Sequence, residues 1–162
     1  MLSTLAILMV CILGASMIYL ILAIVGVLRF ARKTRQASVE DNETPLTVLK
    51  PVCGLEPGLM ENLCSFCDQD YLTYQVIFAV HNPKDPAISI IKNIIAKFPD
   101  KDLSLVINEQ ALGKNLKASN LVNMFKKARH DIIVVADSDV RVRRDYLKAV
   151  AAPFINAKVA AA

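Results

Sequence analysis

Charged and apolar residues are unevenly distributed along the chain. The first 28 residues contain no charged side chain, and residues 5–28 form an almost unbroken apolar run. A helix needs about 20 apolar residues to cross the hydrocarbon core of a bilayer. A cleaved signal peptide would instead have a basic start and an apolar core of about 7–15 residues. The run therefore predicts a retained transmembrane helix.

Beyond a polar stretch at residues 36–44, the hydrophobic pattern alternates between two periods. Runs rich in β-branched and aromatic residues predict strands at residues 46–50, 74–80, 103–107 and 132–136. Apolar positions with helical spacing predict helices at residues 57–69, 85–98, 115–129 and 145–153. Strands that alternate with helices favour an α/β fold with a mostly parallel sheet. The last of these strands is apolar throughout, which predicts a central strand buried on both faces.

Apolar residues in the helices predict which faces turn inward. For the first helix the apolar positions are Met60, Leu63, Cys64 and Cys67. In the third predicted helix the apolar residues Leu116, Leu121, Met124 and Phe125 lie near one stripe, together with the polar Asn120. Side chains three and four residues apart share one face of a helix, so these sets are expected to pack on the sheet.

Composition and charge divide the chain into parts. Of its 162 residues, 54% are hydrophobic, and the excess over the usual about 45–50% comes from the N-terminal run. Basic residues follow that run directly and none precedes it; they are Arg29, Arg32, Lys33 and Arg35. This asymmetry predicts that the C-terminal side is cytosolic. The cluster lies where an orientation signal belongs, so nucleic-acid binding is not expected.

We therefore expect three parts along the chain. They are a transmembrane anchor at residues 1–28, a basic juxtamembrane segment and linker at residues 29–44, and an α/β domain at residues 45–162. That domain stops soon after its fourth strand, which suggests a truncated product.

Ligands of open parallel sheets bind beyond the carboxyl ends of the strands. In this sequence the rule selects four segments, residues 50–54, 81–85, 113–117 and 137–139. Together they supply carboxylates, lysines, glycines and amides. This inventory suits a phosphorylated ligand held with a divalent cation.

The triplet Asp137-Ser138-Asp139 is the strongest signal for chemistry. Two carboxylates two residues apart at the end of a strand can bind one hard cation. The alternative is a solvated turn, because Asp and Ser are common turn residues. An aspartyl-phosphate phosphatase also uses two such acids, but on its first strand and followed by Thr, whereas Val140 follows here. A metal or nucleotide site is therefore favoured.

Other residues at this edge have both a structural and a functional interpretation. Asp85 precedes Pro86, which is typical of a helix start, and its carboxylate can equally accept from a nucleotide. Lys114 and Lys117 flank an expected helix N-terminus, where anions are favoured. Two interpretations are open for these lysines: they bind a diphosphate, or they are simply solvated. The same two interpretations apply to Lys50. Gly54 and Gly113 most simply supply turns.

Several common motifs are missing or isolated. The sequence has neither GxxxxGK[ST] nor GxGxxG, which argues against a P-loop and against dinucleotide binding. Cys64 and Cys67 lie on the apolar face of a predicted helix without a second pair of ligands, so they are expected to pack in the core. His81 and His130 are isolated, and no Ser/His/Asp arrangement is apparent.

Three segments resemble the ceramide glucosyltransferase family, including bacterial members associated with hopanoid biosynthesis. They are PLTVLKPVCGLEPGLMENLCSFCDQDY at residues 45–71, FAVHNPKDPAI at residues 78–88, and LGKNLKASNLVNMFKKARHDIIVVADSDVRV at residues 112–142. The resemblance extends roughly from Pro45 to Val159, with a leading transmembrane helix. It implies a partial GT-A-type, Rossmann-like, mostly parallel sheet with flanking helices.

The resemblance also implies an activity and a set of residues. The family's enzymes are inverting glycosyltransferases that use a UDP-sugar (glucose or N-acetylglucosamine), a divalent cation (Mg²⁺ or Mn²⁺) and a membrane lipid hydroxyl such as that of ceramide or a hopanoid. The resemblance carries Asp85, Lys117, Asn120 and Asp137 as donor-binding residues, and the strand ends add Lys50, Pro51, Gly54 and Lys114 to the candidates. The implied metal ligands are Asp137 and Asp139. Lys117 and Asn120 fall in a segment that reads PKxNNL in the family, with Leu116 in place of the proline.

The sequence departs from the family pattern at its C-terminal end. The third family aspartate, expected to be the catalytic base, and the QxxRW-like motif would both lie beyond Ala162. The chain is therefore expected to carry only the donor and metal half of a membrane-bound enzyme. A non-catalytic, membrane-anchored nucleotide-binding remnant or partner subunit is the main alternative, and a membrane phosphohydrolase that uses the aspartate pair is a third.

Overall fold

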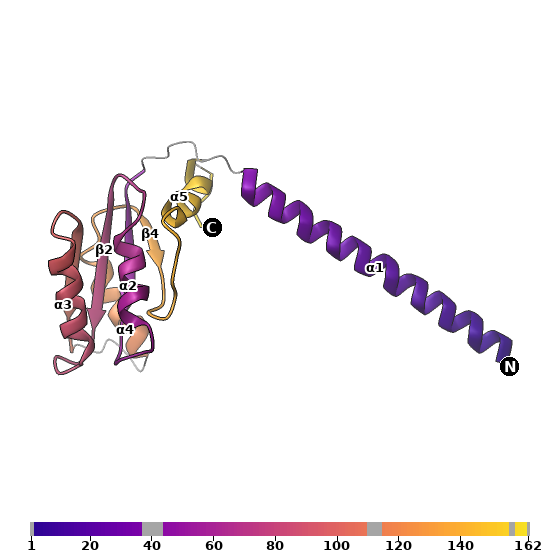
Figure 1. Ribbon diagram of the computed structural model, residues 1–162, viewed down its shortest axis with the longest axis horizontal. Coiled ribbons are helices and arrows are strands. Elements are labelled where there is room, and N and C mark those ends of the chain that lie inside the picture. The colour runs from indigo at the N-terminus through magenta and orange to yellow at the C-terminus, as the bar shows by residue number, and fades with distance from the viewer. Residues whose placement is uncertain (1, 37–43, 110–114, 156–157, 162) are drawn as a thin grey trace. The chain divides into compact units, whose positions relative to one another are not determined.

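The computed structural model describes residues 2–36, 44–109, 115–155 and 158–161. The chain divides into two compact units, Met1–Ser38 and Val39–Ala162. In the first unit α1 (Leu2–Gln36) is one continuous helix (Figure 1). Its part Ser3–Phe30 is long and apolar enough to cross a membrane, which makes it a candidate span. The helix continues through the basic segment, and the rest of the predicted linker, residues 37–43, lies outside the described residues.

The second unit contains a four-stranded parallel sheet. Its strands are β1 (Leu46–Pro51), β2 (Tyr74–Val80), β3 (Asp102–Ile107) and β4 (Ile132–Val135). Their order is β3-β2-β1-β4. Val48 of β1 lies opposite Val76 of β2 and Val134 of β4. The predicted mostly parallel α/β sheet is confirmed, and each predicted strand is within one residue of its observed position.

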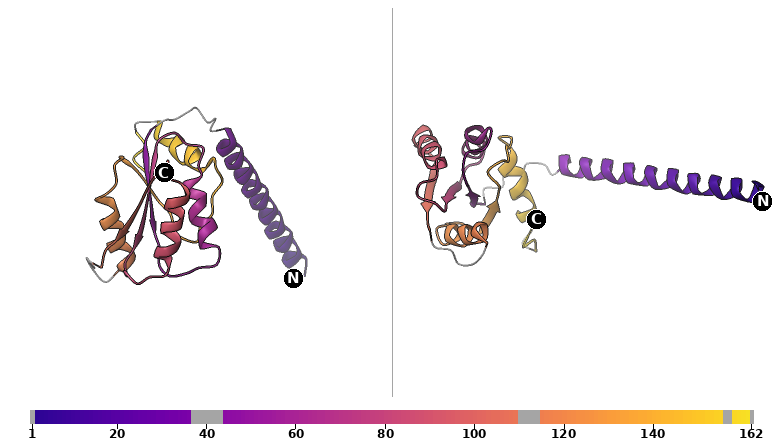
Figure 2. Two further views of the ribbon diagram at one scale, coloured as in Figure 1. Left: turned by 60° about the vertical axis from the view of Figure 1, so that its left-hand side comes forward. Right: turned by 90° about the horizontal axis from the view of Figure 1, so that it is seen from below.

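Helices cover both faces of this sheet. They are α2 (Leu59–Cys67), α3 (Ala87–Lys97), α4 (Leu116–Phe125) and α5 (Tyr146–Ala151), which continues as a 3₁₀ turn at Ala152–Ile155. Figure 2 shows α4 on the side of the sheet opposite α2 and α3. Helices α2, α3 and α5 share one apolar core with β1, β2 and β4. Met124 of α4 packs with Leu49, Ile77 and Ala79 on the other face.

Polar side chains of α2 hold the segment that follows β4. The Nδ2 group of Asn62 donates to the carbonyl of Asp139 (3.2 Å). The hydroxyl of Ser65 accepts from the amide of Val142 (3.1 Å). Just after the helix, Gln69 is buried, donates to the carbonyl of Arg143 and accepts from the amide of Leu147. Asn62 and Ser65 are three residues apart and share one face of α2, and together with Gln69 they fix the course of the chain beyond the sheet.

Two predictions about burial are wrong. The apolar strand β4 is not central: among the described residues it pairs with β1 alone, and Val135 is 52% exposed. On α4, Phe125 is 62% exposed, although it was expected on the inner stripe. Helix α4 contacts the sheet through Met124, with Leu121 packed beside it, so the next residue points about 100° away. The side chain of Leu116 lies outside the described residues.

Candidate functional site

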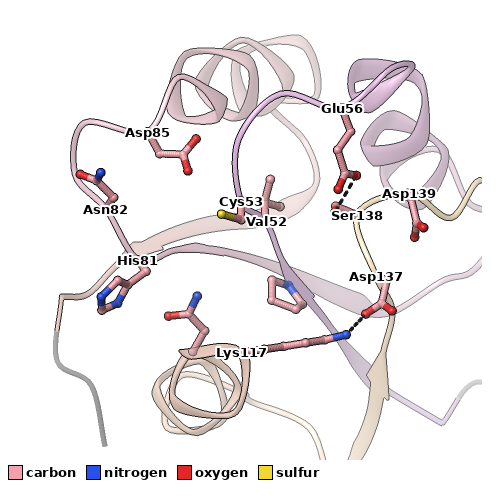
Figure 3. Close-up of a pocket in the computed structure, with 12 residues that line it drawn as sticks. Val52, Cys53, Glu56, His81, Asn82, Asp85, Lys117, Asp137, Ser138 and Asp139 are labelled. Atoms are coloured by element: carbon pink, nitrogen blue, oxygen red, sulfur yellow. Dashed lines mark hydrogen bonds and ion pairs between the residues drawn. The ribbon is translucent and has the colours of Figure 1, made fainter. Parts of the chain in front are cut away.

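A pocket of about 580 Å³ lies at the carboxyl ends of the strands, as the strand-end rule predicts. It is lined by Pro51, Val52, Cys53, Glu56, His81, Asn82, Asp85, Lys117, Asn120, Asp137, Ser138 and Asp139. Figure 3 shows His81, Asn82 and Asp85 on one side, and Glu56 with the acidic triplet on the other. Lys117 reaches from α4 toward Asp137. The fold thus brings together residues separated by more than 80 positions.

The first wall of the pocket is organised by the carboxylate of Asp85. One oxygen accepts from the amide of Ala87 at the start of α3 (2.9 Å). The other accepts from the amide of Gly54 in the loop after β1 (2.9 Å). Gly54 has φ +68°, a left-handed conformation that glycine adopts without strain. The predicted helix-start role of Asp85 is therefore confirmed, and the same side chain ties two loops together.

The opposite wall is the acidic triplet after β4. Lys117 places its ammonium 2.6 Å from Oδ1 of Asp137, and each side chain is 54% exposed. The hydroxyl of Ser138 donates to Oε2 of Glu56 (3.0 Å). These contacts leave both aspartate side chains at the solvent-accessible surface of the pocket. A half-exposed carboxylate next to a flexible ammonium can exchange partners at little cost, because exposed ion pairs contribute only about 0–1 kcal/mol.

Lys50 lies beneath that wall and is fully buried. Its ammonium donates to the backbone carbonyl of Asp137 (2.6 Å) and lies 3.7 Å from the centroid of the Phe66 ring. Burial lowers the pKa of Lys50 to about 8, although the carboxylates of Asp137 and Asp139 favour its charged form. Lys50 does not line the pocket; it supports the residues that do.

The structure brings most of the predicted site residues to one place. Pro51, Asp85, Lys117, Asn120, Asp137 and Asp139 line the pocket, whereas Gly54 joins it through its hydrogen bond to Asp85. Lys114 and Gly113 lie outside the described residues. Glu56 was not predicted, although it follows Gly54 by two positions in the same strand-end loop. His81, noted only as an isolated histidine, lines the pocket with Nδ1 3.0 Å from the carbonyl of Asn108.

The oxygen ligands of the acidic turn fit a divalent cation bound together with a phosphorylated ligand. Asp137 and Asp139 provide two carboxylates, and no group of three His, Cys, Asp or Glu that could hold a metal occurs among the described residues. Mg²⁺ is commonly held by one or two carboxylates, with waters and substrate phosphates completing the shell. Two carboxylates are thus the donor set expected of a cation shared with a ligand, and a closed protein cage would need more ligands than these.

The CxxC pair lies away from this chemistry. Cys67 is fully buried and its thiol donates to the carbonyl of Leu63 (3.4 Å). Burial raises the pKa of Cys67 to about 12 and also raises that of Cys64. A thiol that keeps its proton is a poor nucleophile and a poor metal ligand. The prediction that these cysteines pack in the core is confirmed.

Comparison with known proteins assigns the family. The model of glycosyl transferase family 21 matches residues 7–162. The chain belongs to this family. It is 35% identical over 116 residues to a ceramide glucosyltransferase of Candida albicans, covering 64% of this chain and 21% of that protein. It is 30% identical over 107 residues to ceramide glucosyltransferase 3 of Caenorhabditis elegans, covering 65% of this chain and 23% of that protein. The family 21 chain thus spans about a fifth to a quarter of the length of these relatives.

Solved structures confirm the GT-A fold of this family 21 chain. The mannosyltransferase PcManGT from Pyrobaculum calidifontis, in complex with GDP-Man and Mn²⁺, matches with a TM-score of 0.61 at 23% identity, covering 77% of this chain and 39% of that one. TarS 1–349 of S. aureus, in complex with UDP, matches with a TM-score of 0.54 at 24% identity, covering 70% of this chain and 32% of that one.

Proposed function

We propose that this chain is the donor-binding part of a membrane-bound, inverting glycosyltransferase that uses a UDP-sugar, with glucose or N-acetylglucosamine as the sugar. The proposed acceptor is the hydroxyl of a membrane lipid such as ceramide or a hopanoid. The observation that carries the proposal is the pocket in which Asp137, Asp139 and Lys117 meet at the carboxyl ends of a GT-A sheet. The family and the ceramide glucosyltransferases among its relatives support the lipid acceptor.

The proposed roles follow from the chemistry of each wall. Asp137 and Asp139 would hold Mg²⁺ or Mn²⁺, and that cation supplies neutralisation of the diphosphate as it leaves. Lys117 can turn its ammonium from Asp137 to a phosphate oxygen, because both side chains are half exposed. Asp85, Gly54 and Pro51 would shape the wall that receives the nucleoside. In an inverting displacement a base removes the proton of the lipid hydroxyl, and these pocket residues act on the leaving-group side.

The membrane arrangement is part of the same proposal. Residues 1–28 would be the anchor, residues 29–44 the basic juxtamembrane segment and linker, and residues 45–162 the nucleotide-sugar-binding part. The apolar helix α1 supports the anchor, and the basic residues after the span support a cytosolic position for the second unit. A C-terminal tag that reacts with an impermeant reagent from outside intact cells would contradict this orientation.

The decisive experiment is calorimetric titration of the full chain in detergent with UDP-glucose and UDP-N-acetylglucosamine, each with and without Mn²⁺. We expect Mn²⁺-dependent binding of one sugar nucleotide and its loss in Asp137→Ala. Asp131→Ala is the matched control, because Asp131 is an exposed acid at the opposite end of β4. A folded chain that binds neither nucleotide, or an Asp137→Ala variant that binds normally, would contradict the proposal. Binding without glycolipid formation would favour a nucleotide-binding subunit.

A further inference from the structure

Lys50 is a buried positive charge directly under the acidic turn. It is 0% exposed and lies on the face of the sheet where Phe66 of α2 packs. Removing an ammonium from water is costly unless its protein surroundings compensate. Here the compensation comes from the Asp137 carbonyl, the ring of Phe66 and the two carboxylates above. A Leu or Met would fill the same space without that cost, so simple packing does not explain a lysine here.

The contact that Lys50 makes is with the main chain of the turn and not with its carboxylates. The Asp137 carbonyl accepts from the ammonium (2.6 Å) and also from the amide of Val140 (3.4 Å), which closes the turn. The amide of Ala136 donates to Leu49, next to Lys50 in β1 (3.1 Å). The turn is thus held through its backbone from below, and the carboxylate of Asp137 keeps its oxygens on the pocket side.

Other ties act on the turn from the side. Asn62 donates to the carbonyl of Asp139, and Ser138 donates to Glu56. Both come from partly or fully exposed side chains, where hydrogen bonds compete with water. In the contact with Lys50 the donor is fully buried and charged, and charge-assisted hydrogen bonds are stronger than neutral ones. It is therefore the tie on which the geometry of the turn depends most.

We infer that Lys50 is a positioning residue for the acidic turn: its buried ammonium fixes the backbone carbonyl of Asp137. The turn then keeps one arrangement in which both carboxylates face a cation and its diphosphate. Lys50 itself touches neither. The inference rests on the proposed function for its ligand, a divalent cation with a nucleoside diphosphate, but the support of the turn is a property of the chain alone.

Lys50→Met tests this inference, because methionine keeps most of the length and volume of the side chain and removes the ammonium. Lys92→Met on the exposed surface of α3 is the control for the loss of one charge. Binding is measured on the full chain in detergent with Mn²⁺ and UDP as probes. We expect Lys50→Met to weaken Mn²⁺–UDP binding about tenfold, as for loss of one charged hydrogen bond, and UDP binding without metal less than twofold.

Lys50→Arg separates charge from packing. Arginine keeps a positive donor, so we expect this variant to bind within about threefold of the unchanged chain. Full recovery is not expected, because the guanidinium is larger and planar. If Lys50→Met does not fold by circular dichroism, Lys50→Gln takes its place with the same expected loss. An unchanged or higher affinity for Mn²⁺–UDP in the neutral variant would overturn the inference. A higher affinity would mean that the ammonium mainly opposes the cation.

Hydrogen exchange without any ligand distinguishes this inference from the proposed function. In Lys50→Met, peptides that span residues 136–142 should exchange faster, whereas peptides from β2 should remain as protected as in the unchanged chain. Unchanged exchange at residues 136–142 would overturn the positioning role even if the chain binds UDP. If exchange increases but the unchanged chain binds no Mn²⁺–UDP, the positioning role stands and the proposed function fails.

Discussion

The two walls of the pocket hold their aspartates in opposite ways. Asp85 uses both carboxylate oxygens to accept from backbone amides, those of Gly54 and Ala87. Asp137 is held by its backbone, through Lys50 and Val140, and its carboxylate meets only the half-exposed Lys117 among the hydrogen bonds of described residues. A carboxylate bound to two amides acts mainly as structure, whereas one next to a mobile ammonium can change partner. The same residue type is therefore tied to the backbone on one wall, and on the other it has the exchangeable contact that the proposed ligand binding requires.

The largest effect should come from the Asp137 wall. Asp137→Asn keeps the shape of the side chain and removes one of two charges for the cation. We expect the affinity for Mn²⁺–UDP to fall about 100-fold, equivalent to about 2.7 kcal/mol. Thermal unfolding should change little, because the side chain is 54% exposed. Calorimetry and a melting curve on the same preparation check both statements. A large loss of stability with intact binding would show that Asp137 has a structural role, and the proposed difference between the two walls would be wrong.

The Asp85 wall should show the opposite pattern. Asp85→Ala removes two hydrogen bonds in which a carboxylate accepts from backbone amides. We expect the free energy of unfolding to fall by about 2 kcal/mol, given about 1.5–3 kcal/mol for a hydrogen bond to a charged group and partial replacement by water. Chemical denaturation with a linear extrapolation measures this change. Asp100→Ala, in the exposed turn before β3, is the control. Equal stabilities of the two variants would contradict a structural role for Asp85.

The sequence predicted the elements of the fold better than their arrangement. Strands such as residues 74–80 are continuous β-forming runs, so local pattern is sufficient to place them. The order of the strands depends on contacts between distant segments. The entirely apolar run of β4 suggested a central position, whereas among the described strands β4 is the last in the order β3-β2-β1-β4. The strand-end rule selected Lys50 as a candidate for a diphosphate, but it did not predict that the ammonium would be buried against the carbonyl of Asp137. That contact joins positions 50 and 137, and nothing local to either encodes it.

Alkaline pH should destabilise the core that supports both walls without acting on either aspartate. The hydroxyl of Tyr74 donates to the carbonyl of Cys67 (2.6 Å), and burial raises the pKa of Tyr74 to about 12. An unfolded tyrosine loses its proton near pH 10, so the folded state binds more protons between about pH 10 and 12. Stability must then fall as pH rises through that window, with Cys67 acting in the same direction.

Tyr74→Phe tests whether Tyr74 causes this loss of stability at alkaline pH, because phenylalanine has no group to ionise. We expect its free energy of unfolding to depend on pH less steeply between about pH 10 and 12, by about 1–2 kcal/mol over the window. Part of the slope remains, because burial also raises the pKa of Cys67, Cys64 and Tyr71. At pH 7 the variant should be slightly less stable, since the hydrogen bond to Cys67 is lost. Identical slopes in denaturation curves of the two proteins would show that Tyr74 does not carry the effect.

The smallest predicted effect concerns Lys117, whose ion pair with Asp137 is exposed on both sides. Lys117→Met should leave the free energy of unfolding within about 0.5 kcal/mol, because exposed ion pairs contribute little. If the ammonium turns from Asp137 to the diphosphate, UDP affinity should fall about fivefold, or about 1 kcal/mol. Uridine, which has no phosphate, should bind as before. Lys126→Met, at the other end of α4 and also exposed, is the control. Equal losses for uridine and UDP would mean that Lys117 shapes the pocket and does not meet the diphosphate, and the Asp137 wall would then lack its exchangeable partner.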